Sequence, residues 1–120
     1  MSLYRFFASA RELKDFNENP SIMTIHTIDD LSEVSNYTDK KNCATIEWKY
    51  NEENAEILID YIKEHLKICP RIELWNTSNE VSKEAVITKC SKHILTKERI
   101  KEIWGKESFE QPECLVVYNS

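Results

Sequence analysis

The stretch Cys90-Ser91-Lys92-His93 is the one place in the sequence where a thiol and an imidazole lie within three positions of each other. Such a pair can supply half of a zinc site, or a nucleophile with its base. On a helix, side chains three positions apart share a face, whereas on a strand they point to opposite faces. The hydrophobic pattern ends a strand near Ser91, which places His93 in the following connection. We therefore expect this motif to be structural, with Cys90 packed at the end of its strand.

Other arrangements of catalytic residues find little support in the sequence. Gly105 is the one glycine, and both the glycine-rich phosphate-binding loops and the nucleophile elbow of hydrolases need more than one. A Cys–His hydrolase also needs a third orienting group and an oxyanion hole. His26 fits a partly buried strand position, and His65 fits a helix end where a cation complements the helix dipole. We predict no catalytic residue, which favours a protein that is not an enzyme.

Charge and hydropathy exclude several classes of partner. The net charge of −5 disfavours nucleic-acid binding, which requires clustered Lys and Arg. No apolar run approaches about 18 residues, so no transmembrane helix is expected. The apolar run Phe6-Phe7-Ala8 is too short for a signal peptide. We expect a cytoplasmic protein whose cysteines stay reduced and which has neither a membrane nor a nucleic-acid partner.

The elements that would position these residues follow from hydrophobic periodicity and helix caps. Alternating residues predict most of the strands, and apolar positions three and four apart predict two helices capped by Asn51 and Thr96. Pro70 and Gly105 end these two helices. A capping box at Thr27 and Asp30 predicts a further short helix. The expected strands are residues 3–9, 22–27, 43–50, 71–77, 85–90 and 114–118, and the expected helices are residues 28–34, 52–66 and 97–104.

From residue 43 onward the order is strand, helix, strand, strand, helix, strand, which resembles the ferredoxin-like split βαβ arrangement. We therefore expect a single α+β domain over residues 1–120. A ferredoxin-like unit would cover about residues 43–120, and the N-terminal strand and short helix would be an extension of it. A chain of 120 residues has the usual size of one domain. This fold hosts many unrelated functions, so it predicts none by itself.

The expected strand order also permits a rival interpretation of the cysteines. In a ferredoxin-like sheet the strand starts at Cys43 and Cys69 lie at the same edge as the strand end at Cys90. Because neighbouring strands are about 4.8 Å apart, these thiols and His93 would come within reach of one zinc ion. Structural zinc sites normally contain close cysteine pairs, and buried cysteines commonly act as small apolar residues. We expect no metal and no cofactor, and keep the site at Cys43, Cys69, Cys90 and His93 as the rival hypothesis.

Aromatic residues indicate a candidate binding surface. Trp75 follows Leu74, so the two side chains point to opposite faces of their strand. We expect Trp75 on the outer face of the sheet together with Tyr4 and Phe6. Exposed aromatic patches commonly bind another protein. The alternative is a second small core, in which the N-terminal segment covers these rings.

These features together favour a small acidic binding protein. Its expected partner is another protein or a second copy of itself, and an acidic surface suits a basic partner, as in an inhibitor or an immunity-type protein. The alternative is a small-molecule-binding or enzymatic domain with a cleft between the sheet and the N-terminal segment. A pocket lined by His or Cys would favour this alternative, whereas a flat aromatic or acidic face would favour protein binding.

Overall fold

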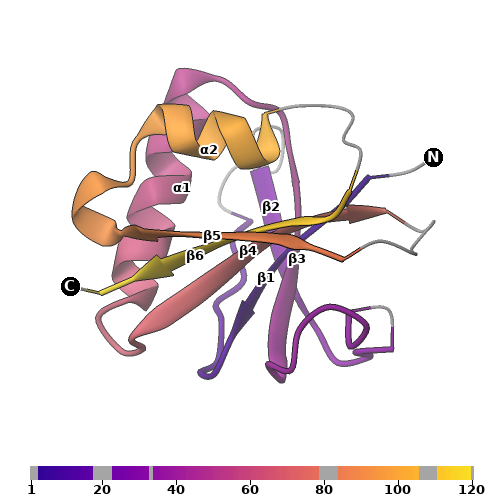
Figure 1. Ribbon diagram of the computed structural model, residues 1–120. Helices are drawn as coiled ribbons and strands as arrows, with labels where there is room; N and C mark the ends of the chain where they lie inside the picture. The colour runs from indigo at the N-terminus through magenta and orange to yellow at the C-terminus, as the bar shows by residue number, and fades with distance from the viewer. Residues whose placement is uncertain (1–2, 18–22, 33, 79–83, 106–110, 120) are drawn as a thin grey trace.

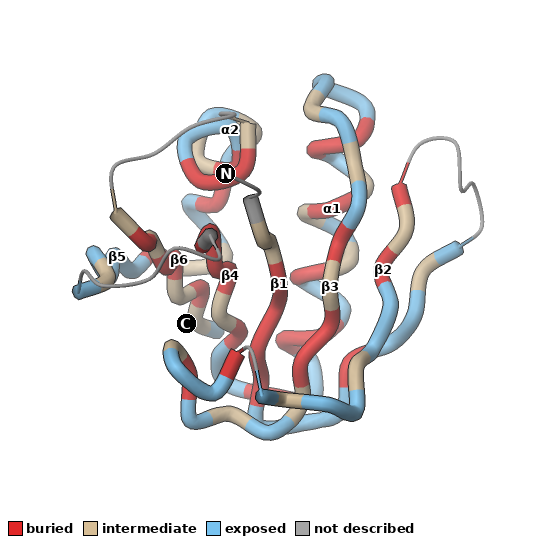
Figure 2. The backbone as a smooth tube through the Cα atoms, turned by 90° about the vertical axis from the view of Figure 1, so that its right-hand side faces the viewer, coloured by how far each residue is buried: buried red, intermediate tan, exposed pale blue. Residues whose placement is uncertain are grey.

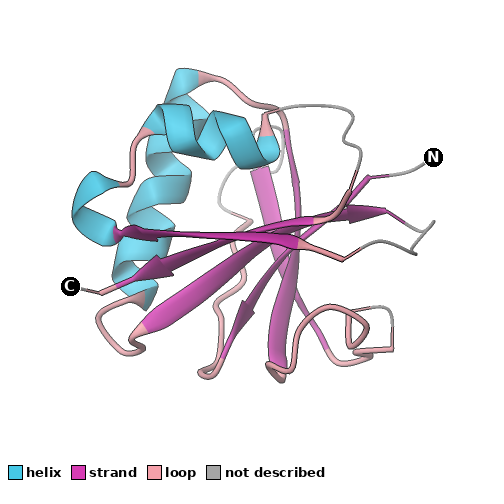
Figure 3. Cartoon of the chain, in the orientation of Figure 1, coloured by secondary structure: helices cyan, strands magenta, loops and turns pink. Residues whose placement is uncertain are grey.

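A mixed β-sheet with two helices on one face makes up the computed structural model of the protein (Figure 1; Figure 3). The structure describes residues 3–17, 23–32, 34–78, 84–105 and 111–119. Within these ranges the strands are β1 (Leu3–Ser9), β2 (Met23–Ile28), β3 (Asn42–Trp48), β4 (Arg71–Ser78), β5 (Val86–Ser91) and β6 (Glu113–Tyr118). The helices are α1 (Glu52–His65) and α2 (Lys97–Trp104), and a short 3-10 turn, η1 (Lys92–Ile94), follows β5. The predicted α+β class is therefore confirmed.

The order of the strands across the sheet is β2-β3-β1-β4-β6-β5. All neighbouring pairs are antiparallel except β5 and β6, which run parallel. The N-terminal strand β1 lies in the middle, where Phe6 is opposite Thr45 on one side and Trp75 on the other. Figure 2 shows β1 as a buried run near the centre of the sheet, with β2 and β5 at the two edges.

The predicted ferredoxin-like unit is not confirmed, because the strand order differs. That arrangement would place β3 between β5 and β6, whereas β3 pairs with β1 and β2. The central position of β1 follows from its sequence. Phe6 and Phe7 are consecutive and both buried, so β1 carries apolar side chains on both faces, as central strands do. In β5, by contrast, Val86 and Ile87 are exposed and Lys89 follows them, which suits an edge strand.

Both longer helices begin where the sequence predicts. The side chain of Asn51 accepts the backbone N–H of Asn54 (2.8 Å), and the side chain of Thr96 accepts the N–H of Arg99 (3.3 Å). These bonds satisfy N–H groups that have no partner within the helix. Each helix buries its apolar face against the sheet, and Trp104 is fully buried at the end of α2.

The predicted short helix over residues 28–34 is wrong. Within this segment Ile28 ends β2, Asp29 is a bend, and Ser32 and Val34 lie in turns. Thr27 lies in β2, where its N–H donates to Asp15 (2.8 Å), so it does not cap a helix. The carboxylate of Asp30 accepts the N–H of Ser32 (3.0 Å), and such local side-chain bonds stabilise turns in competition with helix.

The sheet is covered on both faces, so buried side chains form two clusters. The larger cluster lies between the sheet and the helices and includes Phe7, Leu58 and Trp104. The smaller cluster lies on the other face and consists of Phe6, Ala8, Val34, Cys43, Trp75 and Cys114. The connection between β2 and β3 closes it, because that connection contributes Val34 and packs Leu31 and Tyr37 against the cluster.

Candidate functional site

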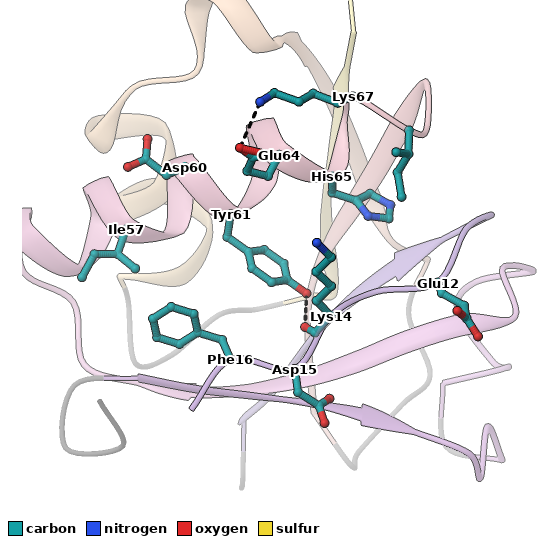
Figure 4. Close-up of a pocket in the computed structure, with 11 residues that line it drawn as sticks. Glu12, Lys14, Asp15, Phe16, Ile57, Asp60, Tyr61, Glu64, His65 and Lys67 are labelled. Carbon is teal, nitrogen blue, oxygen red and sulfur yellow. Dashed lines mark hydrogen bonds and ion pairs between the residues drawn. The ribbon is translucent and has the colours of Figure 1, made fainter. Parts of the chain in front are cut away.

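A groove runs along α1, between this helix and residues 12–16 of the connection from β1 to β2 (Figure 4). Its volume of about 500 Å³ is in the range of ligand-binding clefts. The lining combines aromatic, apolar and charged side chains, namely Glu12, Lys14, Asp15, Phe16, Ile57, Asp60, Tyr61, Glu64, His65, Lys67 and Ile68.

Hydrogen bonds to both the helix and the sheet hold residues 12–16 in place. The Tyr61 hydroxyl donates to the carbonyl oxygen of Lys14 (2.6 Å). Phe16 exchanges two backbone hydrogen bonds with Ile25 of β2, each 2.9 Å long. Burial raises the pKa of Tyr61, so its hydroxyl stays protonated and continues to donate. The groove is therefore bounded by fixed walls.

The groove is acidic. Lys67 pairs with Glu64 (3.0 Å), and Asp15 accepts the N–H of Thr27, which lowers the pKa of Asp15 and keeps it ionised. Four carboxylates less two ammonium groups leave two negative charges in the lining, from Glu12, Asp15, Asp60 and Glu64 against Lys14 and Lys67. A cation is therefore the favoured occupant.

At the end of the groove, three side chains from distant segments form a hydrogen-bonded cluster. His65, the last residue of α1, lines the groove (Figure 4). Its Nε2 is 2.6 Å from Oγ of Ser9, the last residue of β1. The same Oγ is 3.4 Å from Sγ of Cys69, which precedes β4. The exposed fractions are 1% for Ser9, 8% for His65 and 4% for Cys69. A hydroxyl placed between an imidazole and a thiol can carry a proton from one to the other.

The Cys69 thiol is surrounded by hydrogen-bonding groups. Burial raises its pKa, but the hydrogen bonds lower it by more, so the net pKa lies below the ordinary value. The lowering bonds come from the Ser9 hydroxyl and from backbone groups of Arg71, Ala10 and Arg11. The protonated thiol also donates to the carbonyl oxygen of Arg71 (3.3 Å), a bond that favours the protonated form.

The other three cysteines are buried in the two apolar clusters. Burial, with a contribution from Glu73, raises the pKa of Cys43 to about 11 and also raises that of Cys114. Burial likewise raises the pKa of Cys90. Among the four thiols, all of which the structure describes, Cys69 is therefore the one that ionises most readily.

The predicted aromatic surface is not exposed. The exposed fractions of Phe6 and Trp75 are 0% and 4%, and Tyr4 is half-buried. Phe6 stacks on Trp75 with ring centroids 6.0 Å apart, and Tyr37 of the β2–β3 connection covers Trp75 at 5.7 Å. The Trp75 indole N–H donates to Glu73 (2.8 Å). These rings form a second core, as the alternative prediction has it, but the β2–β3 connection covers them and the N-terminal segment does not. Burial of such rings stabilises the fold.

The ligands of the rival zinc site are separated. Cys43 lies on β3 in the smaller cluster, whereas Cys90 is buried at the end of β5 in the larger cluster, on the opposite face of the sheet. These strands are four positions apart, which corresponds to about 19 Å. Cys69 contacts Ser9, and His93 is exposed in η1. Within the described ranges, no three His, Cys, Asp or Glu side chains lie close enough together to hold a metal ion.

Sequence reasoning did not predict the Ser9–His65–Cys69 cluster. The four-residue spacing of His65 and Cys69 at a helix end is a local signal, because such residues lie near each other. Ser9 gives no local signal, since only the pairing of β1 with β4 brings it to Cys69. His65 lies in the last turn of α1, at the helix end where the sequence places it. Burial lowers the pKa of His65 and favours its neutral form, which can accept a proton.

Neither helix in the described ranges is long and apolar enough to cross a membrane. None of the four cysteines, all of them described, forms a disulfide. A search for related sequences and structures found no match among models of protein families, characterised proteins or solved structures.

Proposed function

We propose that the protein binds a basic segment of a partner protein in the groove along α1, in the manner of an inhibitor or an immunity-type protein. The acidic lining of the groove carries this proposal, because its carboxylates outnumber its lysines around the rings of Phe16 and Tyr61. The whole chain is also negatively charged, with a net charge of −5. The approach of a basic partner is therefore favoured by the whole molecule as well as by the groove.

The groove suits a basic segment in chemistry as well as in charge. Cationic groups of the partner would lie against Asp60 and Glu64 of α1 and against Asp15 on the opposite wall. The ring of Phe16 adds a cation–π attraction. Ile68 is 58% exposed and offers apolar surface to the aliphatic part of a Lys or Arg side chain.

A cytoplasmic location is part of the proposal. The four thiols without a disulfide suit a reducing compartment. The partner would then be a cytoplasmic protein, or a protein that enters the cytoplasm.

The experiment compares two double variants that remove the same charge. Asp60→Asn with Glu64→Gln changes the groove, and Glu98→Gln with Glu102→Gln changes the surface of α2. The control is closely matched, since Glu64 pairs with Lys67 three positions away (3.0 Å) and Glu102 pairs with Arg99 three positions away (3.1 Å). The probe is a short synthetic peptide of lysine and leucine, and the Kd is measured by calorimetric titration at low and high salt.

We expect the groove variant to weaken binding and the control variant to leave it nearly unchanged. An exposed ion pair contributes about 0.2–1 kcal/mol, so the loss of two carboxylates should raise the Kd about 2- to 30-fold. Added salt should reduce the difference. Equal weakening in both variants would mean that only net charge matters, and the groove would then not be the binding site.

A second candidate function is the binding of a small cationic molecule. The concave shape of the groove and its volume of about 500 Å³ favour it. Titration with tyramine, whose ring and ammonium group match the aromatic and acidic lining, distinguishes the two. If tyramine binds in the groove with a Kd as low as that of the peptide or lower, the small-molecule function is favoured.

A further inference from the structure

The Ser9–His65–Cys69 cluster is not needed for the binding of a cation in the groove. Ser9 Oγ lies at its centre and has three polar neighbours. They are the backbone N–H of Arg11 (3.2 Å), Nε2 of His65 (2.6 Å) and Sγ of Cys69 (3.4 Å). All three side chains of the cluster are buried, so these contacts are shielded from solvent.

The hydrogen-bonding capacity of the Ser9 hydroxyl limits where the protons of the cluster can lie. A hydroxyl has one proton to donate and two lone pairs that accept. The N–H of Arg11 occupies one lone pair. One lone pair and one proton then remain for His65 and Cys69, so Ser9 accepts from one of them and donates to the other. Ser9 is therefore built to connect the thiol and the imidazole.

We propose that Cys69 is a site of oxidation by small hydroperoxides, and that Ser9 and His65 relay the proton of its thiol. In the resting state Cys69 donates to Ser9, and Ser9 donates to Nε2 of the neutral imidazole. Transfer of both protons along this chain leaves a thiolate that accepts from Ser9 and an imidazolium whose Nε2–H donates to Ser9. The carbonyl of Arg71 is a second acceptor for the thiol in the resting state (3.3 Å).

The oxidation step balances with hydrogen peroxide as the oxidant. The thiolate sulfur attacks one peroxide oxygen, so an S–O bond forms and the O–O bond breaks. Cys69 loses two electrons and becomes a sulfenic acid, and the peroxide is reduced. The leaving hydroxide takes the proton held on His65 and departs as water, which restores the neutral imidazole.

The low exposure of Cys69 limits the size of the oxidant that can reach it, and its polar neighbours distinguish it from the other cysteines. Cys69 is 4% exposed, so only a small molecule can reach its sulfur. Cys43, Cys90 and Cys114 are also buried, but they pack in the two apolar clusters. Cys90 has Arg99 beside it, which cannot take up the proton of the thiol. Because oxidation follows thiolate character, these three cysteines are internal controls in the same molecule.

The test treats the folded protein with hydrogen peroxide in the presence of dimedone, which traps sulfenic acids. Mass spectrometry of the digested protein then gives a modification rate for each of the four cysteines. We expect Cys69 to be modified at least tenfold faster than Cys90 or Cys114, because only Cys69 has the Ser9–His65 pair to take up its proton. Equal rates at these sites would overturn the proposed site of oxidation.

Two variants test the relay. Ser9→Ala removes the connecting hydroxyl, and His65→Gln keeps a polar side chain that cannot take up a proton. Each should slow the modification of Cys69 by about tenfold and raise the pH midpoint of its alkylation by iodoacetamide by about one unit. The charged side chains on the neighbouring segments, Arg11, Glu12, Glu64, Lys67 and Arg71, are the same in both variants, so the midpoint reports on the relay.

The variants are compared only after circular dichroism shows that they fold. If Ser9→Ala does not fold, His65→Gln and the ranking of the four cysteines in the unmodified chain still decide the question. A rate and a midpoint at Cys69 that stay at the wild-type values in a folded variant would overturn the relay. The α2 surface variant, Glu98→Gln with Glu102→Gln, should leave both quantities unchanged, because it alters neither the cluster nor the charged side chains on the segments beside it.

Discussion

Replacement of Trp104 by alanine is expected to destabilise the fold by about 4–5 kcal/mol. Truncation of a buried Trp or Phe to Ala costs about 3–5 kcal/mol, and Trp104 is 1% exposed. Its ring packs edge-on against Phe7, with centroids 4.9 Å apart. Its indole N–H donates to the carbonyl oxygen of Trp75 (2.9 Å), so the variant also loses this buried hydrogen bond. This places the expected cost at the upper end of the range.

A second variant, Trp104→Phe, separates the two contributions. It keeps an aromatic ring against Phe7 but removes the indole N–H. We expect a loss of about 2 kcal/mol, from the lost hydrogen bond to the carbonyl of Trp75 together with the smaller ring. The exposed variant Glu102→Ala on the same helix is the control, and it should change the stability by no more than about 0.5 kcal/mol.

Urea titration followed by far-UV circular dichroism measures the free energy of unfolding in each protein. A domain of this kind is stable by about 5–15 kcal/mol, so Trp104→Ala should lower the midpoint strongly or abolish the folded baseline. A loss below about 1 kcal/mol in both Trp104 variants would mean that α2 does not pack on the sheet through this side chain.

The remaining predictions concern the smaller cluster and His65. Glu73→Ala removes the carboxylate that accepts from Thr38 (2.7 Å) and Trp75 (2.8 Å). We expect a loss of about 2 kcal/mol in urea titrations and a red shift of tryptophan emission; an unchanged spectrum would contradict the role of Glu73. Burial lowers the pKa of His65, so the unfolded chain binds a proton more readily than the folded chain. The stability from this group is complete above the unfolded pKa of about 6.5 and is lost as the pH falls toward the folded value. His65→Gln should flatten the fall in unfolding free energy below pH 6.5, and equal slopes in both proteins would refute this.

The helices could be predicted from the sequence because local residues determine where they begin. Asn51 and Thr96 accept backbone N–H groups within one turn, and no distant segment is needed for such a bond. The strand order is not local. The sequence does indicate that β1 is apolar on both faces, at Phe6 and Phe7, but element order alone treats this strand as an extension. Because adjacent side chains on a strand point to opposite faces, burying both rings requires β1 to be covered on both faces, as a central strand is.

The candidate site depended on the strand order and was missed for that reason. The rival zinc site required Cys43 and Cys90 to lie on neighbouring strands, and it has no basis once β1, β4 and β6 lie between them. The same insertion of β1 brings Ser9 to Cys69. The spacing of His65 and Cys69 was readable in the sequence, but their connecting hydroxyl was not.

The central position of β1 also has a consequence for synthesis on the ribosome. This strand pairs with residues 42–45 of β3 and 73–78 of β4, which both follow it in the chain. At about 5–20 residues per second, the end of β4 is made about 4–14 s after β1. During that time Phe6 and Phe7 lack the strands that flank them. We expect the nascent chain to remain prone to aggregation over this interval, and the sheet to form only after β4 has left the ribosome.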